Sequence, residues 1–149
     1  MSSLSARLAS VVDALPLRPD MRVLEIGGGP GAAAKAVATR IRQGHILMID
    51  RSAKSAALAT SSAAEEIAAG RMSVRHVAVE DFVLAEGEVP FDLAFGIRVG
   101  ALDGRHPELT AIALQRIADA LTPEGRLFID GGDPLREIRL PQRSAPASR

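Results

Sequence analysis

Apolar residues recur along the chain in two spacings, one typical of helices and one typical of buried strands. Leu4, Leu8, Val11 and Leu15 recur at steps of four, three and four, which places them on one face of a helix within residues 1–20. Short apolar runs that end in glycine or in charged residues indicate strands. The elements expected after this first helix are, in chain order, strand 21–26, helix 32–42, strand 45–50, helix 53–69, strands 72–79 and 91–95, helix 107–121 and strand 126–129.

The alternation of strands with helices predicts crossover units, and therefore an α/β fold with a doubly wound, mostly parallel sheet of about five strands. Residues 46–49 and 127–129 are apolar throughout, as expected of strands covered by helices on both faces in a three-layer α/β/α arrangement. The 149 residues have the length of a single domain, 1–149. Residues 136–140 could add one short strand, and the acid-free segment 141–149 is expected to be a flexible tail.

Composition and charge narrow the classes of function. The chain has 18 basic and 18 acidic side chains, so it lacks the cationic surplus by which proteins hold nucleic acids or anionic membranes. The absence of cysteine excludes disulfide bonds and thiolate metal sites, and no spacing of histidines or acids is typical of another metal site. No apolar run has the form of a signal peptide or a membrane span, so a cytoplasmic location is expected.

A glycine-rich segment, residues 27–31, lies between the first predicted strand and the helix that follows it. Glycine allows a tight turn and a close approach of the backbone to a ligand, and the N-terminus of the helix offers N–H groups to that ligand. Gly27, Gly29 and Ala32 also fit the dinucleotide-binding pattern, and Asp50, at the end of the next strand, suits a ribose hydroxyl in either interpretation. A nicotinamide-dinucleotide-binding protein is therefore one alternative.

Acidic residues around the glycines favour a cationic ligand over a diphosphate. Glu25 lies two residues before the first glycine, where a carboxylate would repel a pyrophosphate group but suits a positive charge. Glu80 and Asp81 follow the third predicted strand, where a carboxylate could accept a hydrogen bond from an exocyclic amine. Asp50 alone could simply cap the helix that follows Ser52, but its register with Glu25 and the glycine loop favours ligand binding.

Five segments together resemble the class I S-adenosylmethionine-dependent methyltransferases, over about residues 21–130. In that family an acid precedes a G-x-G-x-G loop, an acid ends the second strand and a Phe–Asp pair opens the fourth. The matching segments are VLEIGGGPG at 23–31, MIDRS at 48–52, VED at 79–81, FDLA at 91–94 and LTPEGRLFI at 121–129, in which Glu124 replaces a glycine of the family's turn. The ordered set is specific, whereas each motif alone is not.

The resemblance implies a Rossmann-like fold and S-adenosylmethionine as the cofactor. The positions that would bind this cofactor are Glu25, Gly27, Gly28, Gly29, Gly31, Asp50, Arg51, Val79, Glu80, Asp81, Gly96 and Ile97. By resemblance, Glu25 would orient the methionine amino group and Asp50 would accept hydrogen bonds from both ribose hydroxyls. Arg51 would pack beside the adenine.

The same resemblance places the adenine amine and the sulfonium. Glu80, or Asp81 one residue later, would accept from the amine beside the backbone of Val79, and Gly96 or Ile97 would line the floor near the sulfonium. The family reaction is an in-line displacement at the methyl group of the sulfonium, so the protein mainly has to align the acceptor with that carbon.

A general base is needed only if the acceptor carries a proton that must leave. His106, close to Asp103 in the loop after the fourth strand, is the candidate catalytic residue, although this segment can also simply be a turn that leads into a helix. Asp130 and Asp133, after the fifth strand, could line an acceptor pocket or form a turn. The predicted function is methyl transfer to a small-molecule acceptor. A non-catalytic S-adenosylmethionine-binding subunit is the alternative, and a dinucleotide-binding protein is less favoured.

The end of the chain departs from the family pattern. The family has seven strands, of which the last two are antiparallel, whereas about 20 residues follow the fifth predicted strand here. We therefore expect a truncated, C-terminally short member of the fold. An exposed sheet edge and the N-terminal helix would then be available for assembly into a homo-oligomer.

Overall fold

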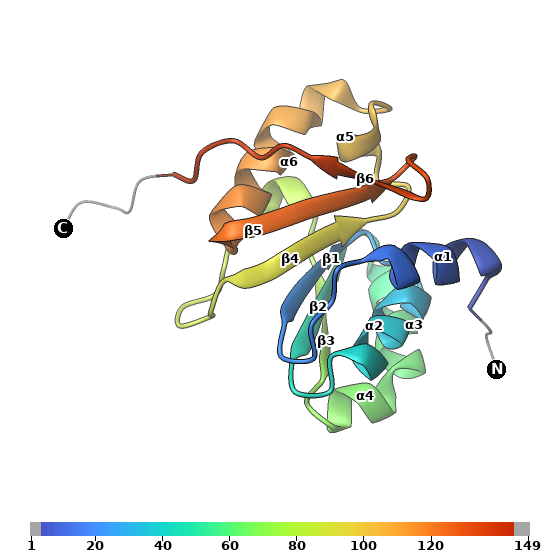
Figure 1. Cartoon of the computed structure of the whole chain (residues 1–149). Helices are drawn as coiled ribbons and strands as arrows, with labels where there is room; N and C mark the ends of the chain where they lie inside the picture. Colours follow the sequence, from blue (N-terminus) through green and yellow to red (C-terminus); the bar gives the residue numbers. More distant parts are fainter. Residues whose placement is uncertain (1–3, 145–149) are drawn as a thin grey trace.

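Six strands form one sheet at the centre of the computed structural model, which describes residues 4–144 (Figure 1). The strands are β1 (Arg22–Ile26), β2 (His45–Asp50), β3 (Met72–His76), β4 (Phe91–Gly96), β5 (Leu121–Asp130) and β6 (Leu135–Ile138). Their order across the sheet is β3-β2-β1-β4-β5-β6, in which β1 to β5 run parallel and β6 pairs antiparallel with β5. The expected mostly parallel sheet is confirmed, with six strands where about five were expected.

Helices cover both faces of the sheet, which gives the expected three layers (Figure 1). The helices on one face are α1 (Ala6–Ala14), α2 (Ala32–Arg40) and α3 (Ala53–Ser62). Those on the other face are α5 (Gly100–Asp103) and α6 (Pro107–Ala120). A 3-10 turn after β3, η1 (Val79–Asp81), packs against α6 on this face. A short helix, α4 (Ala64–Ala68), contacts β3. No helix within residues 4–144 is long and apolar enough to cross a membrane.

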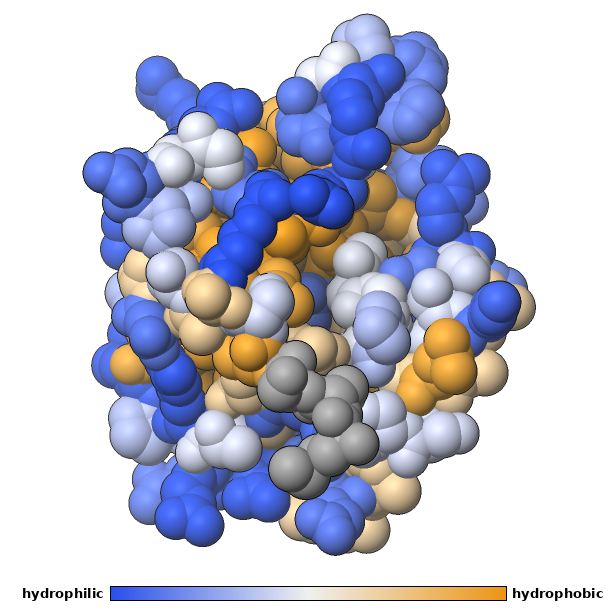
Figure 2. Space-filling model, turned by 90° about the vertical axis from the view of Figure 1, so that its right-hand side faces the viewer, coloured by the Kyte–Doolittle hydropathy of each residue, from blue (hydrophilic) through white to orange (hydrophobic). Residues whose placement is uncertain are grey.

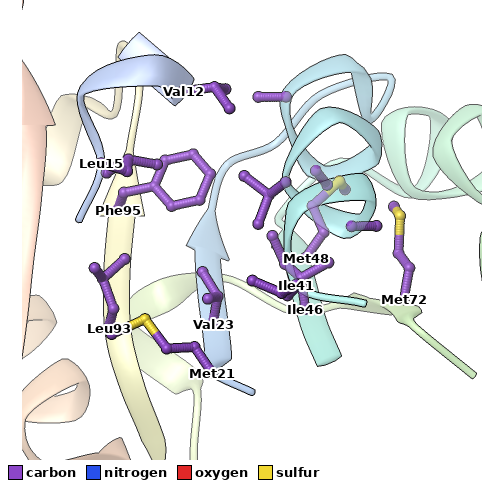
Figure 3. Close-up of a cluster of buried hydrophobic side chains, with 14 of the residues drawn as sticks. Val12, Leu15, Met21, Val23, Ile41, Ile46, Met48, Met72, Leu93 and Phe95 are labelled. Carbon is purple, nitrogen blue, oxygen red and sulfur yellow. The ribbon is translucent and has the colours of Figure 1, made fainter. Parts of the chain in front are cut away.

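Alternate residues of the central strands point to opposite faces, so the sheet carries two apolar cores. In β1, Val23 belongs to the core beneath α1–α3, whereas Leu24 belongs to the core beneath α5 and α6. Figure 3 shows the first of these cores, in which Leu15, just after α1, lies beside Phe95 of β4. Glu25 follows Val23 by two residues, so the same alternation turns its carboxyl group towards the α1–α3 layer.

Two expected elements differ from the structure. The expected continuous helix 53–69 is wrong, because the chain kinks at Ala63, after two serines of modest helix propensity, and continues as α4. The expected strand 72–79 ends at His76, because the N–H of Asp81 donates to the carbonyl of Ala78 at 3.0 Å and turns the chain into η1. Helix α5 was not expected, since four residues are too few to show a helical apolar pattern.

The start of the predicted tail is bonded to α6. Ser144 donates its backbone N–H to Oδ1 of Asp119 at 2.7 Å and its hydroxyl to Oδ2 at 2.8 Å. The side chain of Gln115 reaches the same serine. The rest of the predicted tail, 145–149, lies outside the described residues, and its flexibility stays a prediction.

Candidate functional site

The carboxyl end of β1 is the point at which the chain changes direction across the sheet. β1 is followed by β2 and β3 on one side, and the chain then returns to place β4 and β5 on the other. In such sheets ligands bind in the crevice at this switch point, because the loops on either side diverge there. The glycine loop, residues 27–31, follows β1 at this position.

The glycine loop lies so close to β1 and β2 that no side chain fits at its centre. A Cβ atom on Gly28 would lie 2.3 Å from Cγ of Met48 and 2.9 Å from Oε1 of Glu25. Gly29 has a φ of 59°, in the left-handed region that glycine adopts without strain. Its N–H donates to Oδ2 of Asp50 at 2.9 Å. The loop is thus a bare backbone surface resting on two acidic side chains.

Asp50 joins the glycine loop to the start of α3. While Oδ2 accepts from Gly29, Oδ1 accepts from the backbone N–H of Ser52 at 2.8 Å. Ser52 is itself the N-cap of α3, because its hydroxyl accepts from the N–H of Ser55 at 3.2 Å. A carboxylate has about four acceptor positions, so Asp50 retains some for a ligand.

Glu25 is a buried acid with an oxygen, Oε1, that has no hydrogen-bonding partner in the described part of the chain. The residue is 2% exposed, and its Oε1 atom accepts no hydrogen bond from any residue between 4 and 144. Burial, and secondarily the charge of Asp50, raise the pKa of Glu25 to about 8. An unpaired buried carboxyl group destabilises a fold. A cation is the partner that would favour the ionised form of this carboxyl group.

A cavity of about 290 Å³ opens beside these residues, at the carboxyl edge of the sheet. Its polar lining consists of Asp50, Arg51, Glu80, Arg98, Arg105 and His106. Its apolar lining consists of Ile26, Ile49, Val77, Val79, Val99 and Leu109, with Gly27, Gly100 and Ala101 completing the wall. Figure 2 shows this side of the molecule, where apolar surface lies in a hollow bordered by hydrophilic side chains.

The structure brings together most of the predicted site residues. Gly27, Asp50, Arg51, Val79, Glu80 and His106 line the cavity, and Glu25, Gly28, Gly29 and Gly31 lie in or beneath the adjoining loop. Glu80 lines the cavity, whereas Asp81 is exposed outside it. Gly96 and Ile97 do not line it. A Cβ on Gly96 would meet the side chain of Val99 at 2.9 Å, and Ile97 packs against the core beneath α1–α3.

His106 lies at the mouth of the cavity, directly before α6. Pro107 is the first residue of that helix, so residues 104–106 form a turn that leads into the helix, as one of the two interpretations of the sequence expected. His106 in this turn also lines the cavity. The imidazole lies against Gly100, on which a Cβ would be 2.3 Å from Cδ2 of His106. The side chain is 55% exposed, and its Nδ1 is 3.5 Å from Oε1 of Glu108. The ring is therefore positioned by packing and reachable from the cavity.

Two arginines of the cavity, Arg98 and Arg105, were not predicted. Arg98 follows β4 with a φ of 57°, which is unusual for a residue with a side chain. Arg105 follows α5 and donates from Nη2 to the carbonyl of Arg98 at 2.6 Å. Their spacing in the sequence gives no signal, because the unpredicted helix α5 brings them together.

A family model described as a methyltransferase domain matches residues 23–125 of the chain. The chain belongs to this methyltransferase family. The match extends from β1 into β5 and so includes the glycine loop, Asp50 and the cavity. Comparison with curated proteins finds no match. The cofactor expected from the sequence, S-adenosylmethionine, is the cofactor of this family, and the resemblance stated above is confirmed.

Solved methyltransferase structures share the fold. An S-adenosylmethionine-dependent methyltransferase from Geobacter sulfurreducens, in complex with S-adenosyl-L-homocysteine, has a TM-score of 0.63 and 24% identity, covering 83% of this chain and 46% of its own. The O-methyltransferase of a trans-AT polyketide synthase multienzyme from Brevibacillus brevis, with the same ligand, has a TM-score of 0.60 and 18% identity, covering 73% and 34%. A coclaurine N-methyltransferase has a TM-score of 0.68 and 17% identity, covering 83% and 34%. The chain thus spans less than half the length of each.

A substitution at Gly28 tests how closely the backbone of the glycine loop approaches the side chains of Met48 and Glu25. Gly28→Ala forces a Cβ against buried atoms of Met48 and Glu25, so we expect a loss of about 1–3 kcal/mol in the free energy of unfolding. The displaced loop should also bind S-adenosylhomocysteine at least about tenfold more weakly, by isothermal titration calorimetry.

Gly70→Ala is the matched control for this variant. Gly70 has a positive φ of 78° but nothing within 4 Å of its Cβ position, so alanine there introduces backbone strain without a clash at the loop. It should lower stability and leave the affinity for S-adenosylhomocysteine unchanged. Equal affinities of the Gly28→Ala and wild-type chains would contradict the placement of the cofactor on this loop.

Among residues 4–144, no group of three or more His, Asp or Glu side chains is close enough to hold a metal ion.

Proposed function

We propose that this methyltransferase-family chain binds S-adenosylmethionine at the cavity and transfers its methyl group to a small-molecule acceptor. The observation that carries the proposal is the pair of buried acids beneath the glycine loop. Glu25 is buried with an unpartnered oxygen, and Asp50 shares its face of the sheet. A ligand with a cationic amino acid part and a ribose satisfies both groups, whereas a diphosphate would face two carboxyl groups.

The residues of the cavity and of the adjoining glycine loop, with Glu25 beneath it, fit the parts of S-adenosylmethionine. Glu25 would pair with the methionine ammonium, directly or through water, and release its own proton as it does so. Asp50 would accept from the ribose hydroxyls at the acceptor positions that Gly29 and Ser52 leave free. The amides of the glycine loop would approach the methionine and the ribose.

The opposite side of the cavity suits an adenine. Val77, Val79 and Leu109 supply apolar surface, and Glu80 supplies a carboxylate for the exocyclic amine. Arg51 lies at the rim, where its planar guanidinium can stack on the base. Of the two acids predicted for this role, the proposal assigns Glu80, because Asp81 does not line the cavity. Gly96 and Ile97 would support the sulfonium end from behind the lining.

The bound cofactor supplies a methyl group on a positively charged sulfur. A lone pair of the acceptor would form the new bond to the methyl carbon, and the electron pair of the broken C–S bond would stay on the sulfur. The chain's main task is therefore to hold the acceptor in line with that bond, which is worth about 7–11 kcal/mol in favourable systems. For an acceptor that must lose a proton, His106 is the proposed base, because it is held against Gly100 at the mouth of the cavity.

The proposed function is tested by thermal unfolding with separate additions of S-adenosylhomocysteine and of NAD. Because a ligand stabilises only the state that binds it, we expect a rise in Tm with S-adenosylhomocysteine and none with NAD. Incubation of the chain with S-adenosylmethionine and a panel of small acceptors should then produce S-adenosylhomocysteine.

A rise in Tm with NAD alone would overturn the proposed function in favour of a dinucleotide site. Binding of S-adenosylhomocysteine without turnover on any acceptor would contradict the catalytic part and favour the non-catalytic subunit. The cytoplasmic location, the homo-oligomer and the lack of nucleic-acid binding stay predictions.

A further inference from the structure

Four arginines gather beside the cofactor cavity, at the carboxyl ends of β4 and β5. Arg7 from α1, Arg98 after β4, Arg105 after α5 and Arg136 from β6 line one open depression of about 830 Å³. Two acids, Asp103 and Asp130, are the acidic residues of its lining. We name these four arginines the arginine cluster.

The arginine cluster carries more positive charge than its own acids neutralise. Arg7 pairs with Asp130 at 2.7 Å and Arg105 pairs with Asp103 at 2.9 Å. Arg98 and Arg136 form no ion pair with any residue between 4 and 144. Two guanidinium groups are therefore left without a carboxylate, in a protein whose net charge is zero.

The backbone of Arg98 is fixed in an unusual conformation. Its N–H donates to Oδ1 of Asp130 at 3.0 Å, and its carbonyl accepts from Nη2 of Arg105 at 2.6 Å. These bonds hold Arg98 at a φ of 57°, a left-handed conformation that costs a side-chain-bearing residue on the order of 1 kcal/mol or more. Residues with strained backbones are common at binding sites. Here the two hydrogen bonds fix the position of the Arg98 backbone, from which its side chain extends.

The depression and the cofactor cavity share a wall. Arg98 and Arg105 line both, so a molecule bound by the arginine cluster lies next to the ligand in the cavity. His106, the proposed base, follows Arg105 directly and lies at the same mouth. The cluster therefore lies on the side of the cavity where His106, the proposed base, would meet a methyl acceptor.

We propose that the arginine cluster binds an anionic group, a carboxylate or a phosphate, of the methyl acceptor. Guanidinium groups match both oxyanions through paired N–H donors, and Arg98 and Arg136 have their donors free of ionic partners. This inference rests on the proposed function, because it names the substrate class of the same site.

The bound anion serves as a handle and is not the atom that is methylated. Hydrogen bonds from guanidinium groups withdraw electron density from an oxyanion and weaken it as a nucleophile. Held at a distance from the reacting atom, the same bonds supply binding energy that orients the acceptor towards the methyl carbon. The acceptor is thus expected to carry its nucleophile and its anionic group on different parts of a small molecule.

The experiment is an NMR titration of the 15N-labelled chain with benzoate, with phenyl phosphate and with the neutral analogue benzamide, at constant ionic strength. We expect both anions to shift the Nε–Hε signals of Arg98 and Arg136, and benzamide to leave them unchanged. The affinities of benzoate and phenyl phosphate show whether the arginine cluster prefers a carboxylate or a phosphate. Binding of benzamide with the same affinity as the two anions would overturn the proposal. A further titration with an oligonucleotide would also overturn it if the oligonucleotide bound and neither small anion did.

Charge-removing variants locate the site. Arg98→Asn, with a residue that tolerates a positive φ, and Arg136→Gln should each weaken anion binding about fivefold or more. Arg42→Gln removes the same charge from an exposed turn between α2 and β2 and should have no effect. Equal affinities in all three variants would overturn the proposal.

A second arm separates this inference from the proposed function. S-adenosylhomocysteine binding, followed by calorimetry, should be preserved in Arg136→Gln, whose side chain does not line the cavity. If the wild-type chain does not bind S-adenosylhomocysteine, the proposed function is wrong. The NMR titration with the two anions then decides separately whether the arginine cluster binds anions. S-adenosylhomocysteine binding without any anion binding would overturn this inference alone.

Discussion

Asp50→Ala will reduce the affinity for S-adenosylhomocysteine by about a hundredfold or more and will also lower stability. The carboxylate accepts from the N–H groups of Gly29 and Ser52, so its removal leaves both donors without their partner. Each lost bond of this kind costs about 0.5–1.5 kcal/mol where water can partly replace it, as it can at these two half-buried sites. We therefore expect the free energy of unfolding to fall by about 1–3 kcal/mol in total, measured by urea denaturation.

Two further variants separate the roles of the Asp50 side chain. Asp50→Asn keeps one acceptor oxygen, so it should retain most of the stability and lose most of the ribose contacts. Asp20→Ala removes a carboxylate that is 72% exposed and should change neither stability nor binding. If Asp50→Ala bound S-adenosylhomocysteine as tightly as the wild type, the assignment of the ribose to this carboxylate would be wrong.

The ligand-free chain should become less stable as the pH rises from about 5 to about 8, because Glu25 stays protonated in the folded core while the unfolded chain releases this proton. The pKa of Glu25 is raised from 4.5 to about 8 by folding, so between these values the folded chain holds a proton that the unfolded chain has lost. Stability from this group is complete below the unfolded pKa and is lost as the pH rises through the folded pKa. The slope approaches about 1.4 kcal/mol per pH unit at most.

Glu25→Gln is the control for this pH dependence, because an amide keeps the shape and cannot ionise. The difference in the free energy of unfolding between the wild type and Glu25→Gln, from urea denaturation at several pH values, isolates Glu25 from the three histidines. At neutral pH, S-adenosylhomocysteine should also displace about one proton from the wild type and none from Glu25→Gln, seen in calorimetry in buffers of different ionisation enthalpy. A flat difference across this range would show that Glu25 is ionised in the free chain.

The acids of the site could be predicted because they follow from local pattern and topology. Glu25 is the next-to-last residue of one apolar run and Asp50 ends another, and strands of a parallel sheet present their carboxyl ends at one edge. The glycines that begin two residues after Glu25 mark the backbone turn that a ligand needs. The succession of strands and helices along the chain, the two apolar faces of the sheet and the position of His106 before a helix beginning at Pro107 follow from the same signals.

The rest of the site depends on contacts that no spacing in the sequence contains. Arg7 and Asp130 are 123 positions apart and meet because α1 lies against the carboxyl edge of the sheet. Arg98 and Arg105 meet through α5, which is too short to show a periodic pattern. The hydrogen bond from Gly29 to Asp50 depends on the positive φ of Gly29. A glycine permits this φ but does not require it, so the sequence alone does not predict the bond.

The carboxylate of Asp130 adds a polar connection between α1 and the segment after β4, which already share the core beneath α1–α3. One oxygen holds the side chain of Arg7 on α1, and the other holds the backbone of Arg98 at the wall of the cavity. A shift of α1 would therefore act, through this one residue at the end of β5, on the segment that carries Arg98 between the cavity and the arginine cluster.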